Sequence, residues 1–309
     1  MELRDRFRGA LLGLAAGDAV GTSVEFEPRG HFAPVTDMTG GGPFALAAGQ
    51  WTDDTSMALC LATSLLECGG FDARDQMDRY SRWAETGYLS STGSCFDVGA
   101  TVAAALSMYR REGQPLAGSE HPDTAGNGSI MRLAPIPMYF FPDLDAAELH
   151  AGRSSRTTHG AAECVDACRL LARIVCRALH GRPSEEVAYG DRESFAGAGK
   201  IVDIARGSYA RKAEADVRGT GYVVDSLEAA LWCFMNTDSF EAAVLRAANL
   251  GDDADTTAAV CGQVAGAFYG AEGIPARWRA RLSFGPEITL IADRIFARSG
   301  VASSGVARP

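Results

Sequence analysis

The chain of 309 residues is acidic, with a formal charge of −10, a pI near 5.0 and 47% apolar residues. This balance excludes a general nucleic-acid-binding or anionic-membrane surface, which needs clustered lysine and arginine. The length permits one large domain or two closely packed lobes. We expect a single domain over residues 1–298 and a flexible tail over residues 299–309.

The N-terminus superficially resembles a signal peptide, because Arg4, Arg6 and Arg8 precede a short apolar run. Acids dilute this basic region, Asp18 ends the run, and no segment reaches the roughly 18 apolar residues that a membrane span needs. The eight cysteines contain no C-x-x-C pair and so make a poor zinc pattern. We therefore expect a soluble protein of the cytoplasm.

Glycine recurs every four residues in this first run, at Gly9, Gly13 and Gly17. The spacing puts the glycines on one face of a helix, where a second helix can approach closely. The small-residue run at 258–267 (AAVCGQVAGA) is the expected partner. Such packing would bring Glu25, and Asp18 in the turn expected after the helix, toward the acidic motifs described next.

Two acidic motifs, residues 52–55 (TDDT) and 251–257 (GDDADTT), each precede an apolar helical pattern. Each motif by itself is better explained as a helix N-terminus, where Asp and Thr accept backbone N–H bonds. Buried together, their carboxylates would need a compensating partner, and hard divalent cations prefer oxygen ligands. The two motifs could therefore hold one or two metal ions between them.

Three further positions each allow a structural and a functional interpretation. Asp97 stands where it could cap a helix through residues 103–106, or bond ligand hydroxyls. The Gly-Asn-Gly turn at 126–128 is an ordinary tight turn or a backbone cradle for an anion. His159, at the expected start of a helix over 161–179, is a satisfied structural group or a donor to a phosphate or ribose oxygen.

Helical periodicity dominates the chain, and no convincing run of period 2 occurs, so the fold class is all-α. The site is expected in loops at one end of a compact helical domain. Residues 28–50 form a Pro- and Gly-rich loop of a length that is usually functional. Further helices are expected over 56–67, 72–86, 229–234 and 240–249, the third after a capping-box-like entry at 225–228.

Five ordered motifs resemble those of the ADP-ribosylglycohydrolase family, which includes the glycohydrolase that reactivates dinitrogenase reductase. They are residues 13–21 (GLAAGDAVG) with Glu25, 51–55 (WTDDT), 126–132 (GNGSIMR), 158–160 (THG) and 253–257 (DADTT). Together they are far more specific than any one of them. One position departs from the family, which usually has Gly-Gly-Asp where this chain has Gly251, Asp252 and Asp253. The extra charge of Asp252 lies beside the expected site.

The resemblance implies a compact orthogonal helical bundle with a cleft that holds two Mg²⁺ or Mn²⁺ ions. The implied metal ligands are Thr52, Asp53, Asp54, Asp253, Asp255 and Thr256. Either Glu25 or Asp253 would serve as the catalytic base. The implied substrate-binding residues are Asn127, Gly128, Ser129 and His159 at the ribose and diphosphate, Asp97 at the distal ribose, and Tyr222 as an aromatic contact.

The activity implied by the resemblance is metal-dependent removal of ADP-ribose from modified proteins. Family frequency favours the N-glycosidic bond of ADP-ribosyl-arginine. Two alternatives stay open: an O-linked acceptor such as serine, or an immunity-type protein that binds and blocks an ADP-ribosylating toxin. The expected partners are the ADP-ribosylated protein, the product ADP-ribose and, as a further candidate, a cognate ADP-ribosyltransferase. We expect a monomer without membrane or nucleic-acid partners.

Overall fold

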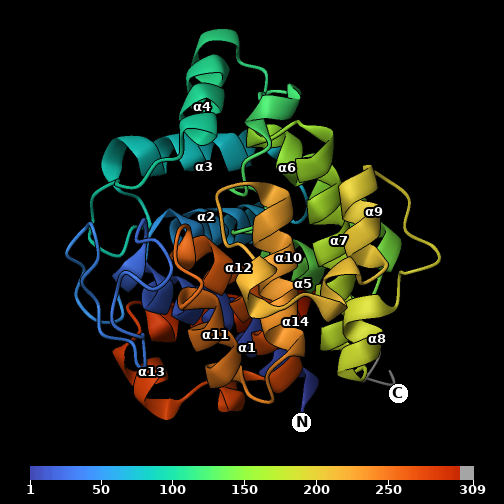
Figure 1. Ribbon diagram of the computed structural model, residues 1–309. Helices are drawn as coiled ribbons and strands as arrows, with labels where there is room; N and C mark the ends of the chain where they lie inside the picture. Colours follow the sequence, from blue (N-terminus) through green and yellow to red (C-terminus); the bar gives the residue numbers. More distant parts are fainter. Residues whose placement is uncertain (300–309) are drawn as a thin grey trace, which may run out of the picture.

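The computed structural model describes residues 1–299, which form helices, loops and three isolated β-bridges, with no longer strand in that range. The all-α prediction is confirmed (Figure 1). The α-helices are α1 (Leu3–Gly21), α2 (Asp53–Cys68), α3 (Ala73–Thr86), α4 (Ala100–Glu112), α5 (Pro135–Phe140), α6 (Leu144–Thr158), α7 (Ala162–Leu179), α8 (Ser184–Tyr189), α9 (Gly199–Ala205), α10 (Val223–Met235), α11 (Phe240–Ala248), α12 (Ala254–Tyr269), α13 (Ala276–Arg281) and α14 (Gly285–Arg298).

Short 3₁₀ helices connect several of these elements. They are η1 (Thr22–Val24), η2 (Pro122–Thr124), η3 (Ser208–Arg211), η4 (Glu214–Asp216) and η5 (Ala271–Gly273). Of the predicted tail, residues 300–309 lie outside the described residues. Ser299 is buried, and its N–H donates to the carbonyl of Ile295 at the end of α14. Among the described helices, none combines the length and apolar character needed to cross a membrane.

Helices α1 and α12 pack against each other at the centre of the bundle, as the glycine spacing predicted (Figure 1). A methyl group on Gly13 would lie 2.3 Å from the carbonyl oxygen of Gly262, and one on Gly17 would lie 2.1 Å from that of Ala258. Only glycine allows so close a backbone approach. These contacts therefore fix the spacing and register of α1 and α12. Acidic residues lie at the C-terminal end of α1 and at the N-terminal end of α12.

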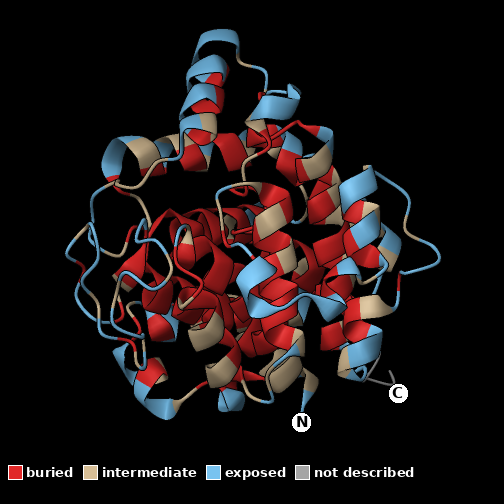
Figure 2. Cartoon of the chain, viewed as in Figure 1, coloured by how far each residue is buried: buried red, intermediate tan, exposed pale blue. Residues whose placement is uncertain are grey.

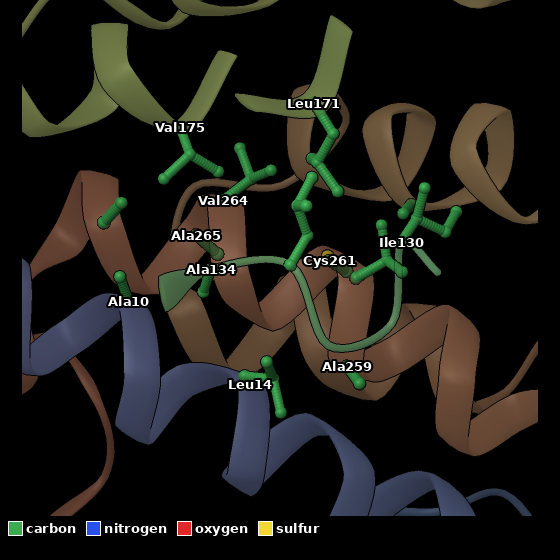
Figure 3. Close-up of a cluster of buried hydrophobic side chains, with 14 of the residues drawn as sticks. Ala10, Leu14, Ile130, Ala134, Leu171, Val175, Ala259, Cys261, Val264 and Ala265 are labelled. Carbon is green, nitrogen blue, oxygen red and sulfur yellow. The ribbon is translucent and has the colours of Figure 1, made fainter. Parts of the chain in front are cut away.

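Buried apolar side chains form one large cluster that runs in sequence from Phe7 to Ile295. Its centre is a contact of α1, α7 and α12 with the loop residues Ile130 and Ala134 (Figure 3). A smaller cluster lies between α2, α3 and α4. Figure 2 shows the buried interior below and the largely exposed α4 projecting above it. The core therefore rigidly supports loops at the α4 end of the bundle.

Several predicted boundaries were wrong. Helix α1 continues through Gly21, so Asp18 is a buried helical residue and does not lie in a turn. Residues 154–158 end α6, a helix that was not predicted, and His159 is its C-cap and does not start a helix. Helices α13 and α14 were likewise not predicted. Tertiary packing overrode the local signals, because glycine contacts with α12 extend to the last turn of α1.

Two expected caps are also corrected. Helix α4 begins at Ala100 with Gly99 as its N-cap, so Asp97 lies outside the helix, with φ of 57°. Helix α10 begins at Val223, two residues before the capping-box-like segment. The Asp225 carboxylate instead accepts a hydrogen bond from the Thr220 hydroxyl, 2.9 Å away. By contrast, the Asp72 side chain caps the helix that was predicted to start there, accepting from the N–H groups of Arg74 and Asp75.

Candidate active site

Asp18 joins α1 to the start of α2. The α2 N-cap, Thr52, makes no capping bond with its own side chain. Asp18 Oδ1 instead accepts from the Thr52 N–H at 2.9 Å, and Asp18 Oδ2 accepts from the Thr55 N–H at 3.0 Å and its hydroxyl at 2.6 Å. Burial raises the pKa of Asp18 to about 6, against the effect of these bonds. A carboxylate from α1 thus positions the first acidic motif.

The two acidic motifs meet, as predicted, although they lie about two hundred positions apart in the chain. Thr256 Oγ1 is 3.2 Å from Asp54 Oδ1, at a separation of 202 positions. Thr52 Oγ1 is 3.2 Å from Asp255 Oδ2, at a separation of 203 positions. The hydroxyls separate carboxylates that would otherwise repel one another. Both motifs therefore contribute oxygen atoms to one buried cluster.

Glu25 and Asp97, from two further segments, join Asp255 in this cluster. Glu25 follows η1, Asp97 lies in the loop before α4, and Asp255 is in the first turn of α12. One oxygen from each lies within 4.8 Å of the others. The predicted approach of Glu25 to the acidic motifs is confirmed. Asp97 joins them because its positive φ turns the loop before α4.

Burial and mutual repulsion raise the pKa of every carboxyl in this group that shows a shift. Burial, then Asp97 and Asp253, raise the pKa of Glu25 to about 9. Burial, followed by Asp18 and Asp253, raises the pKa of Asp97 to about 7. The pKa values of Asp53, Asp54 and Asp255 also rise well above the usual range, first through burial and then through neighbouring acids. The cluster is therefore short of positive charge.

The donor set suits a divalent metal ion. Asp54 Oδ2 is buried and makes no hydrogen bond within the part of the chain that the structure describes. An uncompensated buried carboxylate oxygen is costly, and a hard cation is the partner that carboxylates and hydroxyls accept best. Neither lysine nor arginine lines the adjacent cavity within residues 1–299. The residues present therefore fit a metal.

A cavity of about 370 Å³ opens directly above the carboxylates. Of the predicted site residues, it is lined by Glu25, Asp53, Asp97, Asn127, Gly128, His159, Asp253, Asp255 and Thr256. Thr52 and Asp54 are buried behind this lining. Ser129 does not line the cavity, and its hydroxyl oxygen is 3.0 Å from Ser155 Oγ. Tyr222 lines an adjoining groove, where its hydroxyl bonds Lys200 and Glu163.

The Gly-Asn-Gly turn packs against His159 at one end of the cavity. A methyl group on Gly128 would lie 2.8 Å from His159 Cε1, so only glycine fits beside the imidazole ring. Between the two glycines, Asn127 Nδ2 donates to Asp253 Oδ2 at 3.0 Å. The turn therefore connects the histidine to the carboxylate cluster.

A buried hydrogen-bond chain fixes the tautomer of His159. Arg132 Nη2 donates to Thr158 Oγ1 at 2.7 Å, and Thr158 Oγ1 is 2.9 Å from His159 Nδ1. Within residues 1–299, His159 Nδ1 is the one acceptor that the Thr158 hydroxyl proton meets, so this proton is assigned to Nδ1 and the ring proton to Nε2. Burial, followed by the charge of Arg132, lowers the pKa of His159 to about 3. His159 therefore presents a neutral Nε2–H.

The sequence reasoning missed several residues of the cavity. Phe26, the first turn of α4 (residues 99–102), Met131 and Gly221 all line it. The N-cap Gly99 leaves the first N–H groups of α4 without a capping side chain. Placing the start of α4 correctly would have revealed this turn. Phe26 had no signal of its own except its position beside Glu25.

The helical bundle encloses a cavity that ends on a buried carboxylate cluster, an arrangement that fits the active site of a metal-dependent enzyme. The family model described as ADP-ribosylglycohydrolase matches residues 1–304, and the chain belongs to this family. It is 46% identical over 295 residues to the "ADP-ribosylarginine hydrolase Tri1" of Pseudomonas putida, covering 96% of this chain and 79% of that protein.

A second relative and a solved structure agree with this membership. The "ADP-ribosyl-[dinitrogen reductase] glycohydrolase" of Rhodospirillum rubrum is 32% identical over 305 residues, with 97% of this chain and 98% of that protein covered. A structure titled "ADP-ribosylglycohydrolase-related protein complex" superposes with a TM-score of 0.85 at 42% identity. It covers 96% of this chain and 99% of the other. The fold is therefore shared along nearly the whole chain.

Proposed function

We propose that the protein hydrolyses the N-glycosidic bond between ADP-ribose and the arginine side chains of modified proteins. The observation that carries this proposal is the convergence of Glu25, Asp97 and Asp255 at the floor of the cavity. The arginine linkage is supported by 46% identity to a relative named for that reaction. The substrate is an ADP-ribosylated protein, and the product is ADP-ribose.

The proposed cofactor is a pair of Mg²⁺ or Mn²⁺ ions. Asp53, Asp54, Asp253 and Asp255 would hold them, with Thr52 and Thr256 as further oxygen ligands. The unpartnered oxygen of Asp54 supports this assignment. Bound divalent ions would orient the ribose hydroxyls and lower the pKa of an attacking water. The proposed ligands come from both ends of the chain, so folding itself assembles the metal site.

The proposed catalytic base is Glu25 or Asp253. Cleavage of a glycosidic bond passes through an oxocarbenium-like transition state, so a carboxylate near the anomeric carbon can stabilise positive charge and remove a proton from water. Both residues line the cavity. Asn127 holds Asp253 Oδ2 in place. Asp97, the third carboxylate of the cluster, would bond the hydroxyls of the distal ribose.

The diphosphate is proposed to lie against the first turn of α4, the 126–128 turn and His159. An acidic protein needs local donors for a dianionic group, and backbone N–H groups at a helix N-terminus provide them. The His159 Nε2–H would add one side-chain donor. Ser129 would support this loop from below, and Tyr222 would provide an aromatic contact from the adjoining groove.

The test is metal-dependent release of ADP-ribose from defined arginine-, serine- and nucleic-acid-linked substrates. We expect release from the arginine-linked substrate with Mg²⁺ or Mn²⁺, and none with EDTA. Asp253→Ala should abolish release while the circular dichroism spectrum is retained, and Asp238→Ala, an exposed acid outside the cavity, should behave as wild type. Full turnover by Asp253→Ala with metal present would refute the assignment.

The same assay separates the alternative functions. Release from serine-linked substrate alone would make this an O-linked hydrolase. An Asp253→Ala protein that co-purifies with an ADP-ribosyltransferase would favour a blocking role. We also propose that the protein is a monomer located in the cytoplasm. Its eight cysteines form no disulfide bonds, which suits a reducing compartment.

A further inference from the structure

An exposed phenylalanine stands at the mouth of the cavity. Phe26 lines the cavity, yet it is 63% exposed, the second largest exposure among the large apolar residues that the structure describes. Its φ is 65°, in the left-handed region that bulky residues rarely adopt. Both features are unfavourable for folding, and such strain persists where the surrounding structure imposes it, commonly at functional sites.

Two more aromatic rings continue this surface. Phe44 lies 6.4 Å from Phe26 and 5.1 Å from Phe96, measured between ring centroids. Phe26 directly follows Glu25, and Phe96 directly precedes Asp97, so rings flank the two carboxylates that face each other in the site. We call Phe26, Phe44 and Phe96 the aromatic rim. Of these three rings, Phe26 lines the cavity. Phe26 and Phe44 belong to the segment between α1 and α2, whose loops lie on the opposite side of the bundle from α6 and α7 (Figure 1).

Two acids without an ion pair within residues 1–299 lie beside Phe26 along the backbone. The Phe26 N–H donates to the Asp252 carbonyl at 2.7 Å, and the Asp252 N–H donates to the Glu27 carbonyl at 2.9 Å. Glu27 and Asp252 are exposed, and neither forms an ion pair within residues 1–299. The nearby Arg29 guanidinium is committed to the carbonyls of Leu250, Glu214 and Val217. The mouth thus combines an aromatic face with free negative charge.

We propose that Phe26, supported by the aromatic rim and by Glu27 and Asp252, is the subsite for the guanidinium of the modified arginine. The proposal rests on the proposed function and deepens it, since that function leaves the acceptor side of the bond without assigned residues. The diphosphate is proposed to lie near His159 and the ribose at the carboxylates. The acceptor must then extend toward the remaining wall, which contains Phe26.

The chemistry of this wall matches a cation. A guanidinium stacks on an aromatic face through cation–π attraction and bonds carboxylates with its planar donors. The arginine side chain is positively charged both before and after ADP-ribose leaves. A serine hydroxyl carries no charge and would gain nothing from Glu27 or Asp252. The subsite therefore selects the acceptor without contacting ADP-ribose.

The test measures steady-state kinetics on an ADP-ribosyl-arginine peptide, together with inhibition by free ADP-ribose. Phe26→Ala should raise KM about five- to tenfold, as expected for a cation–π contact of 1 kcal/mol or slightly more, and change kcat less than twofold. The inhibition constant of ADP-ribose should stay within twofold of wild type. Phe26→Tyr should restore KM, whereas Phe26→Leu should not. Leu290→Ala, which truncates another exposed apolar residue outside the cavity, is the matched control.

The acids are tested with Glu27→Gln and Asp252→Asn. Each should raise KM for the arginine-linked peptide, and the double variant should weaken competitive inhibition by free arginine but not by neutral citrulline. An unchanged KM in Phe26→Ala, or an equal loss of ADP-ribose inhibition, would overturn the proposal. If wild type releases no ADP-ribose from the arginine peptide, the proposed function itself fails. Normal wild-type release with an unaffected Phe26→Ala overturns only the subsite.

Discussion

Individual residues around the cavity adopt unusual states that folding alone does not favour. Phe26, Asp97 and Asp252 all have positive φ, although none is glycine. Asp18 and Asp54 are completely buried carboxylates. Such strain and desolvation concentrate where a geometry is needed for a ligand. Substitutions at such residues should therefore change the free energy of unfolding and the KM for substrate independently of each other.

Asp252→Gly should increase stability. Asp252 has φ of 55°, and glycine adopts this region without the steric strain of a side chain. We expect the free energy of unfolding to rise by about 0.5–1 kcal/mol in urea denaturation, because relief of the left-handed strain outweighs the extra freedom of glycine in the unfolded chain. The same variant removes a carboxylate from the proposed acceptor subsite, so its KM for the arginine-linked peptide should rise. A less stable Asp252→Gly protein would contradict the strain argument.

His159→Gln should retain more binding than His159→Leu. Only a neutral Nε2–H is proposed to contact the substrate, and the glutamine amide can supply a comparable donor. A hydrogen bond to a charged group contributes about 1.5–3 kcal/mol to the binding free energy, so its loss in His159→Leu should raise KM at least tenfold. Because the pKa of His159 is about 3, wild-type KM should show no histidine step between pH 6 and 8. Equal KM values in the two variants would exclude the donor role.

At the scale of elements, the α1–α12 contact determines where the acidic residues lie. Gly21, the last residue of α1, meets the backbone of Ala254, the first residue of α12, and a methyl group there would lie 2.3 Å from its carbonyl oxygen. Asp18 then extends the same arrangement to α2. The α1–α12 contact and the Asp18 carboxylate thereby hold together the C-terminus of α1 and the N-termini of α12 and α2.

Gly17→Ala should destabilise the protein although alanine favours helices by about 1 kcal/mol. Its methyl group would meet the Ala258 carbonyl oxygen at 2.1 Å, and backbone atoms cannot move aside as a flexible side chain can. We expect a loss of about 2–3 kcal/mol in the free energy of unfolding, measured by denaturation. Gly199→Ala, in α9 with no atom within 4 Å of the new methyl, should be neutral or stabilising.

The segment after α8 is held to α7 by Asp191, which bonds Arg173 and Arg177. Burial alone would raise the pKa of Asp191, but hydrogen bonds and charge from Arg177 and Arg173 lower it below the usual 3.8. The folded pKa is depressed, so this stabilisation is full above the unfolded pKa and is lost as pH falls through the folded pKa.

Asp191→Asn should therefore destabilise the protein by about 3 kcal/mol at pH 7, because Arg177 loses its carboxylate partner and Arg173 keeps only Glu148. The difference from wild type should shrink as pH is lowered from 5 toward 3. Urea denaturation at several pH values measures this change. A deficit that does not depend on pH would show that Asp191 acts through packing alone.

In the molecule as a whole, folding brings carboxylates from distant segments into one buried site, and their burial and mutual repulsion lower the stability of the metal-free protein. Glu25, Asp54, Asp97 and Asp255 come from four different parts of the chain. Their pKa values are raised first by burial and then by mutual repulsion, and a bound divalent cation would offset both. A ligand that binds only the folded state stabilises it in proportion to the logarithm of its concentration.

Added Mg²⁺ or Mn²⁺ should therefore raise the melting temperature of metal-free protein. Saturation at 100 times Kd contributes about 2.7 kcal/mol, which corresponds to an increase of roughly 5 °C. Asp54→Asn should melt higher than wild type without metal, since it removes a buried charge, and should lose the metal response. Asp238→Asn should respond as wild type does. Differential scanning calorimetry with and without EDTA measures both effects.

The amino-acid sequence was enough to predict the fold class, the α1–α12 pairing and the convergence of the acidic motifs. These features depend on periodic or repeated local patterns, namely helical apolar spacing, glycine at every fourth position, and paired Thr-Asp motifs. The glycine spacing restricts α1 to one close partner, and the small-residue run at 258–267 supplies it. Family motifs then indicated the chemistry.

The helix boundaries and the part of the site that lies in loops depend on tertiary contacts. The helix continues past Asp18 because Gly17 and Gly21 pack against α12. Asp97 lies outside the expected cap where the chain turns through positive φ, and Phe26 reaches the cavity from a loop. The His159 tautomer depends on Arg132, which lies 27 positions away in the chain. Such positions are set by contacts between distant segments, and no local propensity encodes them.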